Sequence, residues 1–409
     1  STRFCIDYRD CNSKLQLLDS PIPLVAEAID RLATGQGDPK TLFLTTLDLA
    51  AGFWTMPIAE ESKPLTAFVT HRQKYEFNYL PFGIQSGPSY MCRLIDSALA
   101  GLAWDICVPY LDDVATWSTG PRSSTGQSFE QRQQASFEQM LHRIDLVFER
   151  LKWAGLSTRA DKCVLFATRA AYLGHEVSRD GLHMDPAKVD KVRNLDPAKV
   201  CSLSDVRSFL GLCSYYRRFI RHFTEMAAPL HDLTKTGVDV ETEVSSERCQ
   251  NAIRTLAHAL TEAPVLAMPQ FDREFILKTD AASTKGIGGV LSQVDDDGQE
   301  RVVAYFGRRL TKHELNYTVT EIELLAAKEA IKHWRPYLWG RRFRLVIDHA
   351  ALRWLHTMKD TVEGGTASRL MRWIAPHTIT SKSLDRAAHG PIPATGPSCF
   401  HRRPQTIVE

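Results

Sequence analysis

Acidic residues at the ends of apolar runs are the side chains of this chain best placed for chemistry. Asp112 and Asp113 follow Tyr110-Leu111 between Val108 and Val114, a pattern that predicts the tip of a β-hairpin. Because successive side chains on a strand point to opposite faces, only one of the two acids can easily share a site with a third acid. Taken alone, the pair could equally be a solvated acidic turn.

A third acid, Asp48, closes the apolar run 42–47 and precedes the turn 50–53. A strand-end carboxylate beside a hairpin carboxylate offers the hard oxygen ligands that Mg²⁺ prefers. Two such ions can activate a 3′-hydroxyl and stabilise a leaving pyrophosphate. Considered by itself, Asp48 could simply cap the turn that follows it.

A second set of acids lies in the C-terminal part of the chain. Asp280 and Asp348 each close an apolar strand, and Glu323 lies one turn into a helix between them. Acids at two strand ends and on a helix could converge at one end of a sheet, again in a two-metal geometry. Glu321 points about 200° away from Glu323 on a helix, and Thr318-x-x-Glu321 has the pattern of a capping box, which leaves Glu323 for a metal. Taken singly, each of these acids could be a solvated surface group.

Mixed α/β patterning must position the first set of acids. Strand-like runs at 42–47 and 67–69 alternate with Gly and Pro breaks, and Pro88 suits the first turn of a helix. That helix would carry one apolar stripe, formed by Leu94, Ile95, Ala98, Leu99 and Leu102. The polar stretch 118–136 predicts a solvated loop. The helix after it would have an apolar face formed by Phe137, Met140, Leu141, Ile144, Phe148 and Leu151.

Helix starts and a new α/β unit are predicted farther along the chain. Asp-Pro-Ala-Lys occurs at 185–188 and 196–199, which predicts two helix starts or turns. Ser202-x-x-Asp205 opens a helix whose apolar positions are Val206, Phe209, Leu210, Cys213 and Ile220. Residues 236–250 are polar and predict a linker or loop. The new unit begins near Val265, with strands at 275–279, 286–289 and 343–347 and a helix at 320–334. From about residue 376 the composition predicts disorder.

The composition limits the class of protein. With 409 residues, 44% hydrophobic and 24% charged, the chain is an ordinary globular sequence with room for two or three domains. A net charge of +2 excludes a polybasic, histone-like protein but not nucleic-acid binding, because local basic surface decides that. We expect no membrane partner, because no apolar run reaches 18 residues and the start does not resemble a signal peptide. Nine scattered cysteines without CxxC spacing favour reduced, mostly buried thiols in a cytosolic setting.

An ordered series of motifs resembles a known family, the reverse transcriptase of gypsy-type LTR retrotransposons. The series consists of Arg3-Phe4-Cys5-Ile6-Asp7-Tyr8-Arg9, the Leu-Asp-Leu-x-x-Gly-Phe segment at 47–53, Leu80-Pro81-Phe82-Gly83, Tyr110-Leu111-Asp112-Asp113, Tyr172-Leu173-Gly174-His175, Phe209-Leu210-Gly211-Leu212, Tyr215-Tyr216-Arg217-Arg218-Phe219 and Pro264-Val265-Leu266. The segments around Asp280 and Asp348 resemble that family's tethered RNase H domain. The resemblance covers roughly residues 1–374, and the ordered series is far more specific than the Tyr-x-Asp-Asp box alone.

The resemblance implies an α/β (α+β) architecture, a right-hand polymerase fold of fingers, palm and thumb followed by a ribonuclease-H-like domain. The expected boundaries are 1–180 for fingers and palm, 181–262 for thumb or connection, 263–374 for the RNase H-like domain and 375–409 for a disordered tail. The implied activity is RNA-directed DNA polymerisation, with a tethered RNase H that would cleave the RNA strand of RNA–DNA hybrids. Expected partners are an RNA or DNA template with its primer, and dNTPs. The implied location is a cytoplasmic retroelement particle or the nucleus, and no oligomeric state is indicated.

Two sets of acids in this chain correspond to the family's metal ligands. Asp48, Asp112 and Asp113 would form the polymerase triad, with Asp48 and Asp112 binding both Mg²⁺ ions, or Mn²⁺ in their place, and Asp113 supporting them. The RNase H metal would be held by the three acids of the C-terminal unit, Asp280, Glu323 and Asp348.

Five further residues of this chain correspond to positions in the family's nucleotide pocket. Phe53 matches an aromatic steric gate that rejects the 2′-hydroxyl of ribonucleotides, although it could also be a core side chain. Arg3 matches a contact to the incoming triphosphate, which the backbone N–H groups of Ala51 and Gly52 would also meet. Phe82 matches a residue lining the pocket; the alternative for Phe82 is packing within a turn.

Two arginine clusters suit phosphate contacts along a duplex. One cluster lies in the implied thumb or connection and the other near the RNase H acids: Arg207, Arg217, Arg218 and Arg221, and Arg335, Arg341, Arg342 and Arg344. The alternative is a pair of solvated basic faces, with Tyr215 and Tyr216 in the core.

Some positions depart from the family pattern. The chain begins at the Arg3 motif, the loop at 118–136 is long, and Ile347 replaces the usual Thr. Pro109 predicts that its strand lies at a sheet edge, because proline cannot donate to a ladder. The final Ala-Asp segment with a fourth RNase H carboxylate is not recognisable, and Asp385 is a poor substitute.

These departures keep a second hypothesis open, a catalytically inactive remnant that only binds nucleic acid. A third, an unrelated two-metal nuclease or phosphotransferase, is disfavoured by the order of the motifs. Extension of a DNA primer on an RNA template separates the first two.

Overall fold

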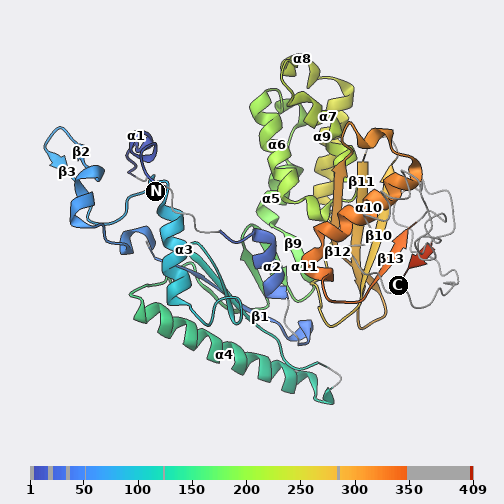
Figure 1. Cartoon of the computed structure of the whole chain (residues 1–409). Coiled ribbons are helices and arrows are strands. Elements are labelled where there is room, and N and C mark those ends of the chain that lie inside the picture. The colour runs from blue at the N-terminus through green and yellow to red at the C-terminus, as the bar shows by residue number, and fades with distance from the viewer. Residues whose placement is uncertain are drawn as a thin grey trace, which may run out of the picture. The chain divides into compact units, whose positions relative to one another are not determined.

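The computed structural model describes residues 4–16, 22–33, 37–50, 52–122, 125–282, 286–347 and 406–408. The chain divides into two compact units, Ser1–His183 and Met184–Glu409, and each is described by itself (Figure 1). Three predicted site residues, Arg3, Ala51 and Asp348, lie outside the described residues, and so do residues 375–405 of the expected tail.

The first unit contains an antiparallel four-stranded sheet in the order β4-β5-β1-β6. Its strands are β1 (Phe43–Asp48), β4 (Cys107–Tyr110), β5 (Asp113–Ser118) and β6 (Val164–Ala167). The other elements of the unit are α1 (Arg9–Asn12), α2 (Val25–Ala33), α3 (Gly87–Ala98), α4 (Phe129–Trp153), a hairpin of β2 (Phe68–Val69) and β3 (Lys74–Tyr75), and a small sheet of β7 (Arg169–Tyr172), β8 (His175–Ser178) and β9 (Gly181–Met184). Strand β4 lies at an edge of the sheet, as Pro109 predicts.

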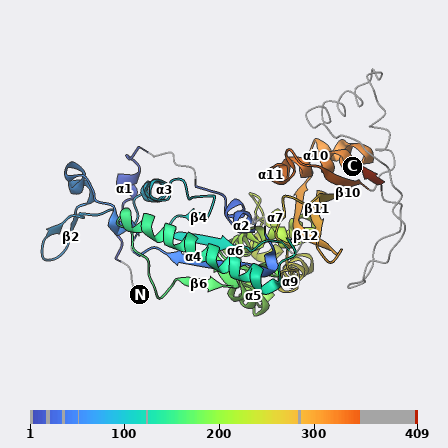
Figure 2. The ribbon, with the colours of Figure 1, turned by 90° about the horizontal axis from the view of Figure 1, so that it is seen from below.

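Apolar side chains of α3 and α4 form the core with the end of β1 that carries Asp48. Helix α4 packs against β1 and β5 (Figure 2), and α3 packs against α4 and β4. The predicted stripe of α3 is confirmed, because Ile95, Ala98 and Leu99 are buried in a cluster with Leu47 and Leu49. This packing fixes the strand end on which Asp48 lies.

Two expectations for α4 are wrong. The helix begins at Phe129, inside the predicted loop, because Ser128 and Gln131 form a reciprocal capping box. Only half of the expected apolar face is buried, since Phe137, Leu141 and Phe148 are 36–55% exposed. The buried stripe runs instead along positions three or four apart, through Met140, Ile144, Val147 and Leu151.

The second unit combines helices with a five-stranded sheet in the order β12-β11-β10-β13-β14. The strands are β10 (Phe275–Ala282), β11 (Gly286–Val294), β12 (Glu300–Arg309), β13 (Phe343–Ile347) and β14 (Thr406–Val408). The helices are α5 (Pro186–Arg193), α6 (Leu203–Tyr215), α7 (Phe223–Leu233), α8 (Val240–Glu243), α9 (Glu247–Thr261), α10 (Val319–His333) and α11 (Arg335–Leu338). Helix α10 packs against β10 and β11, while α7 packs against β12.

Several expectations for the second unit need correction. Residues 236–250 are not a linker, because they contain α8 and the start of α9, which Ser246 caps. Strand β10 runs to Ala282, three residues beyond the predicted end, because it continues to pair with the glycine-rich β11. Strand β12 was not predicted. Thr406–Val408 pair with β13, in a region where disorder was expected.

The capping predictions for the second unit are confirmed. Asp185 and Asp196 each accept a bond from the backbone N–H two residues later. Ser202 and Asp205 cap α6 reciprocally, and Val206, Phe209, Leu210 and Cys213 are buried. Tyr216 is buried but Tyr215 is 43% exposed, so only one of the two tyrosines lies in the core. The eight described cysteines are free, and four of them are buried.

Candidate active sites

The three N-terminal acids meet at one end of the first sheet. Asp48, the last residue of β1, lies directly opposite Asp113, the first residue of β5. A two-residue turn, Leu111–Asp112, joins β4 to β5, and the backbone N–H of Leu49 donates to the carbonyl of Asp112 at 2.9 Å. Leu111 has a φ of 54°, a left-handed conformation that costs a non-glycine residue about 1–2 kcal/mol and that shapes this turn. Backbone pairing therefore places all three acids around the same strand end.

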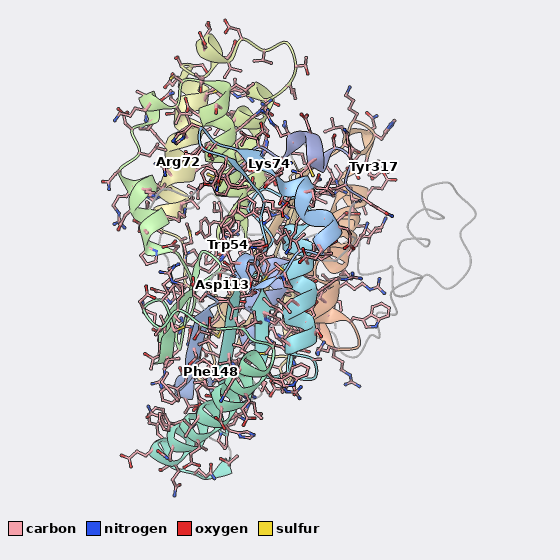
Figure 3. All side chains as sticks on the ribbon, turned by 90° about the vertical axis from the view of Figure 1, so that its left-hand side faces the viewer. Trp54, Arg72, Lys74, Asp113, Phe148 and Tyr317 are labelled. Carbon is pink, nitrogen blue, oxygen red and sulfur yellow. The ribbon has the colours of Figure 1, made fainter. Side chains whose placement is uncertain are left out.

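The carboxyl group of Asp113 is perturbed by burial and by its charged neighbours. Burial, and then the charges of Asp112 and Asp48, raise its pKa from 3.8 to about 6, while the charge of Lys162 lowers it. Like charges and partial burial both disfavour the ionised form, so a cation beside the cluster would stabilise the ionised carboxylates. Figure 3 shows Asp113 within the first unit, with Phe148 lower down on α4.

Lys162 contacts the cluster, which the sequence analysis did not predict. Its Nζ lies 3.1 Å from Oδ2 of Asp48. The segment that carries it is bonded along the end of β1: the backbone N–H of Arg159 donates to the carbonyl of Asp48 at 2.8 Å, and that of Ala50 donates to Ser157 at 2.7 Å. The spacing of more than a hundred residues between Lys162 and Asp48 gives no local signal by which the pair could have been found.

The donor chemistry of the cluster fits a hard divalent cation. Within the described ranges, no three Asp, Glu, His or Cys side chains are already gathered in a form that could hold a metal. Mg²⁺, however, needs only one or two carboxylates when substrate phosphates and water complete its six ligands. The carboxylates of Asp48, Asp112 and Asp113 can supply those ligands.

The residues after Asp48 pack against α3 and Phe82. Gly52 is buried, and a side chain there would collide with Met91 of α3. Phe53 is half-buried, and its ring packs edge-on against Phe82 at 5.6 Å between centroids. Gly87, at the start of α3, lies so close that an added Cβ would be 3.0 Å from the Phe53 ring. Phe53 is thus held in place by Phe82 and by the backbone of α3.

The Tyr172-Leu173-Gly174-His175 motif has a structural role beside this site. Leu173 and Gly174 have φ values of 46° and 67° and form the turn between β7 and β8. The buried Tyr172 hydroxyl donates to the carbonyl of Val108 at 3.0 Å, which ties β7 to the strand that leads into the Asp112 turn. Burial raises the pKa of this phenol, so the hydroxyl keeps its proton and remains a donor.

Replacing Asp113 with Asn is expected to stabilise the metal-free protein at pH 7.5 by about 1–2 kcal/mol, after allowance for solvent screening. The folded state binds a proton at Asp113 more tightly than the unfolded state does, so Asp113 makes stability fall as pH rises from about 4 to about 6. Thermal denaturation in EDTA should show a Tm a few degrees higher for the variant at pH 7.5, and the difference should shrink toward pH 4. An unchanged or lower Tm at pH 7.5 would contradict the destabilised carboxylate.

The second set of acids is only partly described. Asp280 is exposed on β10, two residues before the strand ends, and it pairs across the sheet with Gly288 of β11. Glu323 lies in α10, the helix that packs against β10, and is 7% exposed. Glu321 is engaged with Thr318 in the predicted capping box, so it has the structural role expected of it. Asp348 lies outside the described residues, although Ile347 before it pairs with Thr279, next to Asp280.

Known families match both units. Residues 1–177 match the family described as reverse transcriptase (RNA-dependent DNA polymerase), and residues 246–345 match an RNase H-like domain found in reverse transcriptase. Over 373 residues the chain is 35% identical to the retrovirus-related Pol polyprotein from transposon 297 of Drosophila melanogaster, covering 91% of this chain and 32% of that protein. The chain thus combines a reverse transcriptase domain with an RNase H-like domain, and it is similar to the Pol polyproteins of gypsy-type retrotransposons. The family resemblance inferred from the motifs is confirmed.

Other relatives agree with this assignment. The chain is 32% identical over 381 residues to the Pol polyprotein from transposon gypsy of Drosophila melanogaster, covering 91% of this chain and 33% of that one. It is 28% identical over 373 residues to the Tf2-3 polyprotein of Schizosaccharomyces pombe, covering 91% of this chain and 26% of the relative. The chain therefore spans about a third or less of the length of these relatives.

Solved structures confirm the fold. The chain matches a foamy viral protease–reverse transcriptase in complex with double-stranded DNA with a TM-score of 0.72 and 20% identity, covering 91% of this chain and 61% of that one. It matches the foamy viral enzyme in complex with an RNA/DNA hybrid with a TM-score of 0.65 and 20% identity, covering 96% and 51%. The mixed α/β fold, a polymerase followed by an RNase H-like domain, is as expected. Among the described helices, none is both long and apolar enough to cross a membrane.

Proposed function

We propose that this reverse transcriptase extends a primer on an RNA or DNA template, using dNTPs. The observation that carries the proposal is the register that places Asp48 opposite Asp113, with Asp112 bonded to the residue after Asp48. Extension of a DNA primer on an RNA template in the presence of Mg²⁺ tests it. In this reaction the primer 3′-oxygen attacks the α-phosphorus of a dNTP, and pyrophosphate leaves.

The three acids would divide the work of holding metal and substrate. Asp48 and Asp112 would bind Mg²⁺, or Mn²⁺ in its place, and Asp113 would support them. When bound, the divalent cation activates the 3′-hydroxyl and stabilises the charge of the leaving pyrophosphate. The chain's own contribution is a fixed strand end: backbone bonds on both sides of β1 hold the acids in place, so little reorganisation is needed at the moment of reaction.

Phe53 would select deoxynucleotides by occupying the space of a 2′-hydroxyl. Its ring is held between Phe82 and the start of α3, so moving it would disrupt this packing. Gly52 gives the backbone its close approach to α3, and its N–H and that of Ala51 would meet the triphosphate. The triphosphate contacts of Ala51 and Arg3 stay predictions.

Replacing Phe53 with Val is expected to raise ribonucleotide incorporation, relative to deoxynucleotide incorporation, by about ten- to a hundred-fold, the usual worth of a shape contact in a pocket. Single-nucleotide extension with each dNTP and its matching rNTP measures the ratio. Phe148→Val, an exposed aromatic replacement on α4, is the matched control and should leave the ratio unchanged. A ratio for the Phe53 variant equal to that of the wild type would rule out the steric gate.

Template and primer would be held by the helical part of the second unit. Arg207, Arg217 and Arg221 are exposed there, and exposed arginines suit contacts with backbone phosphates. The foamy viral relatives were solved with double-stranded DNA and with an RNA/DNA hybrid, which supports the same class of ligand for this chain. The arginines near the RNase H acids are partly engaged within the protein, since Arg344 pairs with Glu274 and Arg341 lies over Phe271.

The RNase H-like domain would cleave the RNA strand of a hybrid with Asp280, Glu323 and Asp348 as its divalent-metal ligands. Support comes from the position of Glu323 on α10, which packs against the strand that carries Asp280, and from the pairing of the strand before Asp348 with that same strand. We retain the proposed boundaries of 1–180, 181–262, 263–374 and 375–409 for the fingers and palm, the thumb or connection, the RNase H-like domain and the tail.

A further inference from the structure

Lys162 makes an ion pair with an acid that the proposed function assigns to metal. The Lys162 ammonium lies 3.1 Å from Oδ2 of Asp48, and the two side chains are 48% and 24% exposed. The neighbouring Arg159 is directed elsewhere, to Asp161 at 3.2 Å. Lys162 is thus the cation that this segment presents to the acids.

The backbone positions Lys162 for this contact. The backbone N–H of Lys162 donates to the carbonyl of Arg159 at 2.9 Å, and the N–H of Arg159 donates to the carbonyl of Asp48 at 2.8 Å. The turn that carries the lysine is therefore bonded to the residue whose carboxylate the lysine neutralises.

The acids need a cation even when no metal is present. Asp48, Asp112 and Asp113 surround one strand end. The negative charges of Asp112 and Asp48 raise the pKa of Asp113, and the positive charge of Lys162 lowers it. A divalent cation at Asp48 would bind the same carboxylate that the ammonium contacts. The two cations would also repel each other at that distance.

We propose that Lys162 is a placeholder cation, which holds Asp48 in the metal-free enzyme and which a divalent metal must displace. This inference rests on the proposed role of Asp48 as a metal ligand. Lys162 is in this sense a positioning residue, and it sets the metal concentration at which the polymerase site fills. Its effect is on metal binding by the protein alone, before any substrate is present.

Binding of Mn²⁺ to the full chain without nucleic acid tests the proposal. The electron paramagnetic resonance signal of free Mn²⁺ falls as the ion binds, so a titration gives the affinity directly. Lys162→Met keeps a side chain of similar length but removes the charge. This variant is expected to bind Mn²⁺ about three- to ten-fold more tightly than the wild type at low ionic strength. The Tm of this variant in EDTA should be lower than that of the wild type, and its rise on adding Mn²⁺ should be larger.

Four further variants make the result decisive. Lys40→Met removes an exposed lysine just before the other end of β1 and should bind Mn²⁺ as the wild type does. Lys162→Arg, which keeps the charge, should also resemble the wild type, and Lys162→Gln repeats the test if the Met variant does not fold. Asp48→Asn should weaken binding.

The outcomes separate this inference from the proposed function. If Asp48→Asn weakens Mn²⁺ binding but the neutral Lys162 variants bind no more tightly than the wild type, the placeholder role is overturned while the metal site stands. If Asp48→Asn leaves binding unchanged, Asp48 is not a metal ligand, and both the metal assignment and the placeholder role fail.

Discussion

Replacing Asp112 with Asn is expected to reduce Mg²⁺-dependent extension of a DNA primer on an RNA template by at least about a hundred-fold. The change removes one negative charge from a cluster whose proposed task is to hold a divalent cation against the primer end. It leaves the backbone bond from Leu49 to the carbonyl of residue 112 in place, so the hairpin should fold as before. Single-turnover extension with excess enzyme measures the loss in the chemical step.

Two comparisons make this result interpretable. Asp145→Asn changes an exposed acid on α4 in the same way and should extend the primer like the wild type. Binding of the primer–template, measured by fluorescence anisotropy, should be similar for all three proteins. If neither the wild type nor the Asp112 variant extends the primer although both bind it, the chain is an inactive remnant that only binds nucleic acid.

Replacing Asp280 with Asn is expected to reduce cleavage of the RNA strand of an RNA–DNA hybrid by at least about a hundred-fold while leaving primer extension unchanged. Asp280 is exposed on β10, so an isosteric amide should not disturb the sheet. Its loss would remove a hard oxygen ligand from the second candidate site. Cleavage of a hybrid labelled on its RNA strand, followed over time on a denaturing gel, measures the effect.

The matched control for this prediction is Asp297→Asn. Asp297 is an exposed acid in the turn between β11 and β12, and its replacement should leave both activities intact. A wild-type chain that extends primers but does not cleave the hybrid would contradict the proposed RNase H activity and leave the proposed polymerase activity standing. Equal cleavage by the wild type and the Asp280 variant would remove Asp280 from the site.

The two adjacent acids of the hairpin tip differ in their surroundings. Asp113 belongs to β5 and lies opposite Asp48 across the ladder, and burial and like charges raise its pKa to about 6. Asp112 belongs to the turn, and its backbone carbonyl is what ties that turn to β1. The proposed division of roles, with Asp112 as a ligand and Asp113 as a support, comes from the family resemblance and is compatible with this difference between turn and strand.

Local patterns in the sequence were sufficient for much of the fold and for the candidate acids. The hairpin at Asp112, the strand ending at Asp48, the edge position of Pro109 and the capping pair of Thr318 and Glu321 all depend on neighbours within a few residues. Such features are determined by backbone geometry and by hydrogen bonds that close locally. The ordered motifs then indicated the family, which the comparisons confirmed.

Contacts between residues that are far apart in the sequence were decided by tertiary packing. Nothing near Lys162 in the sequence points to Asp48, because an ion pair across more than a hundred residues depends on the turn that the backbone of β1 holds. Which part of the apolar face of α4 is buried was decided by the contacts of the helix with β1 and β5. The polar start of α9 likewise became helical because its later apolar residues, such as Ile253 and Leu256, are buried in the second unit, and burial outweighs a weak local preference.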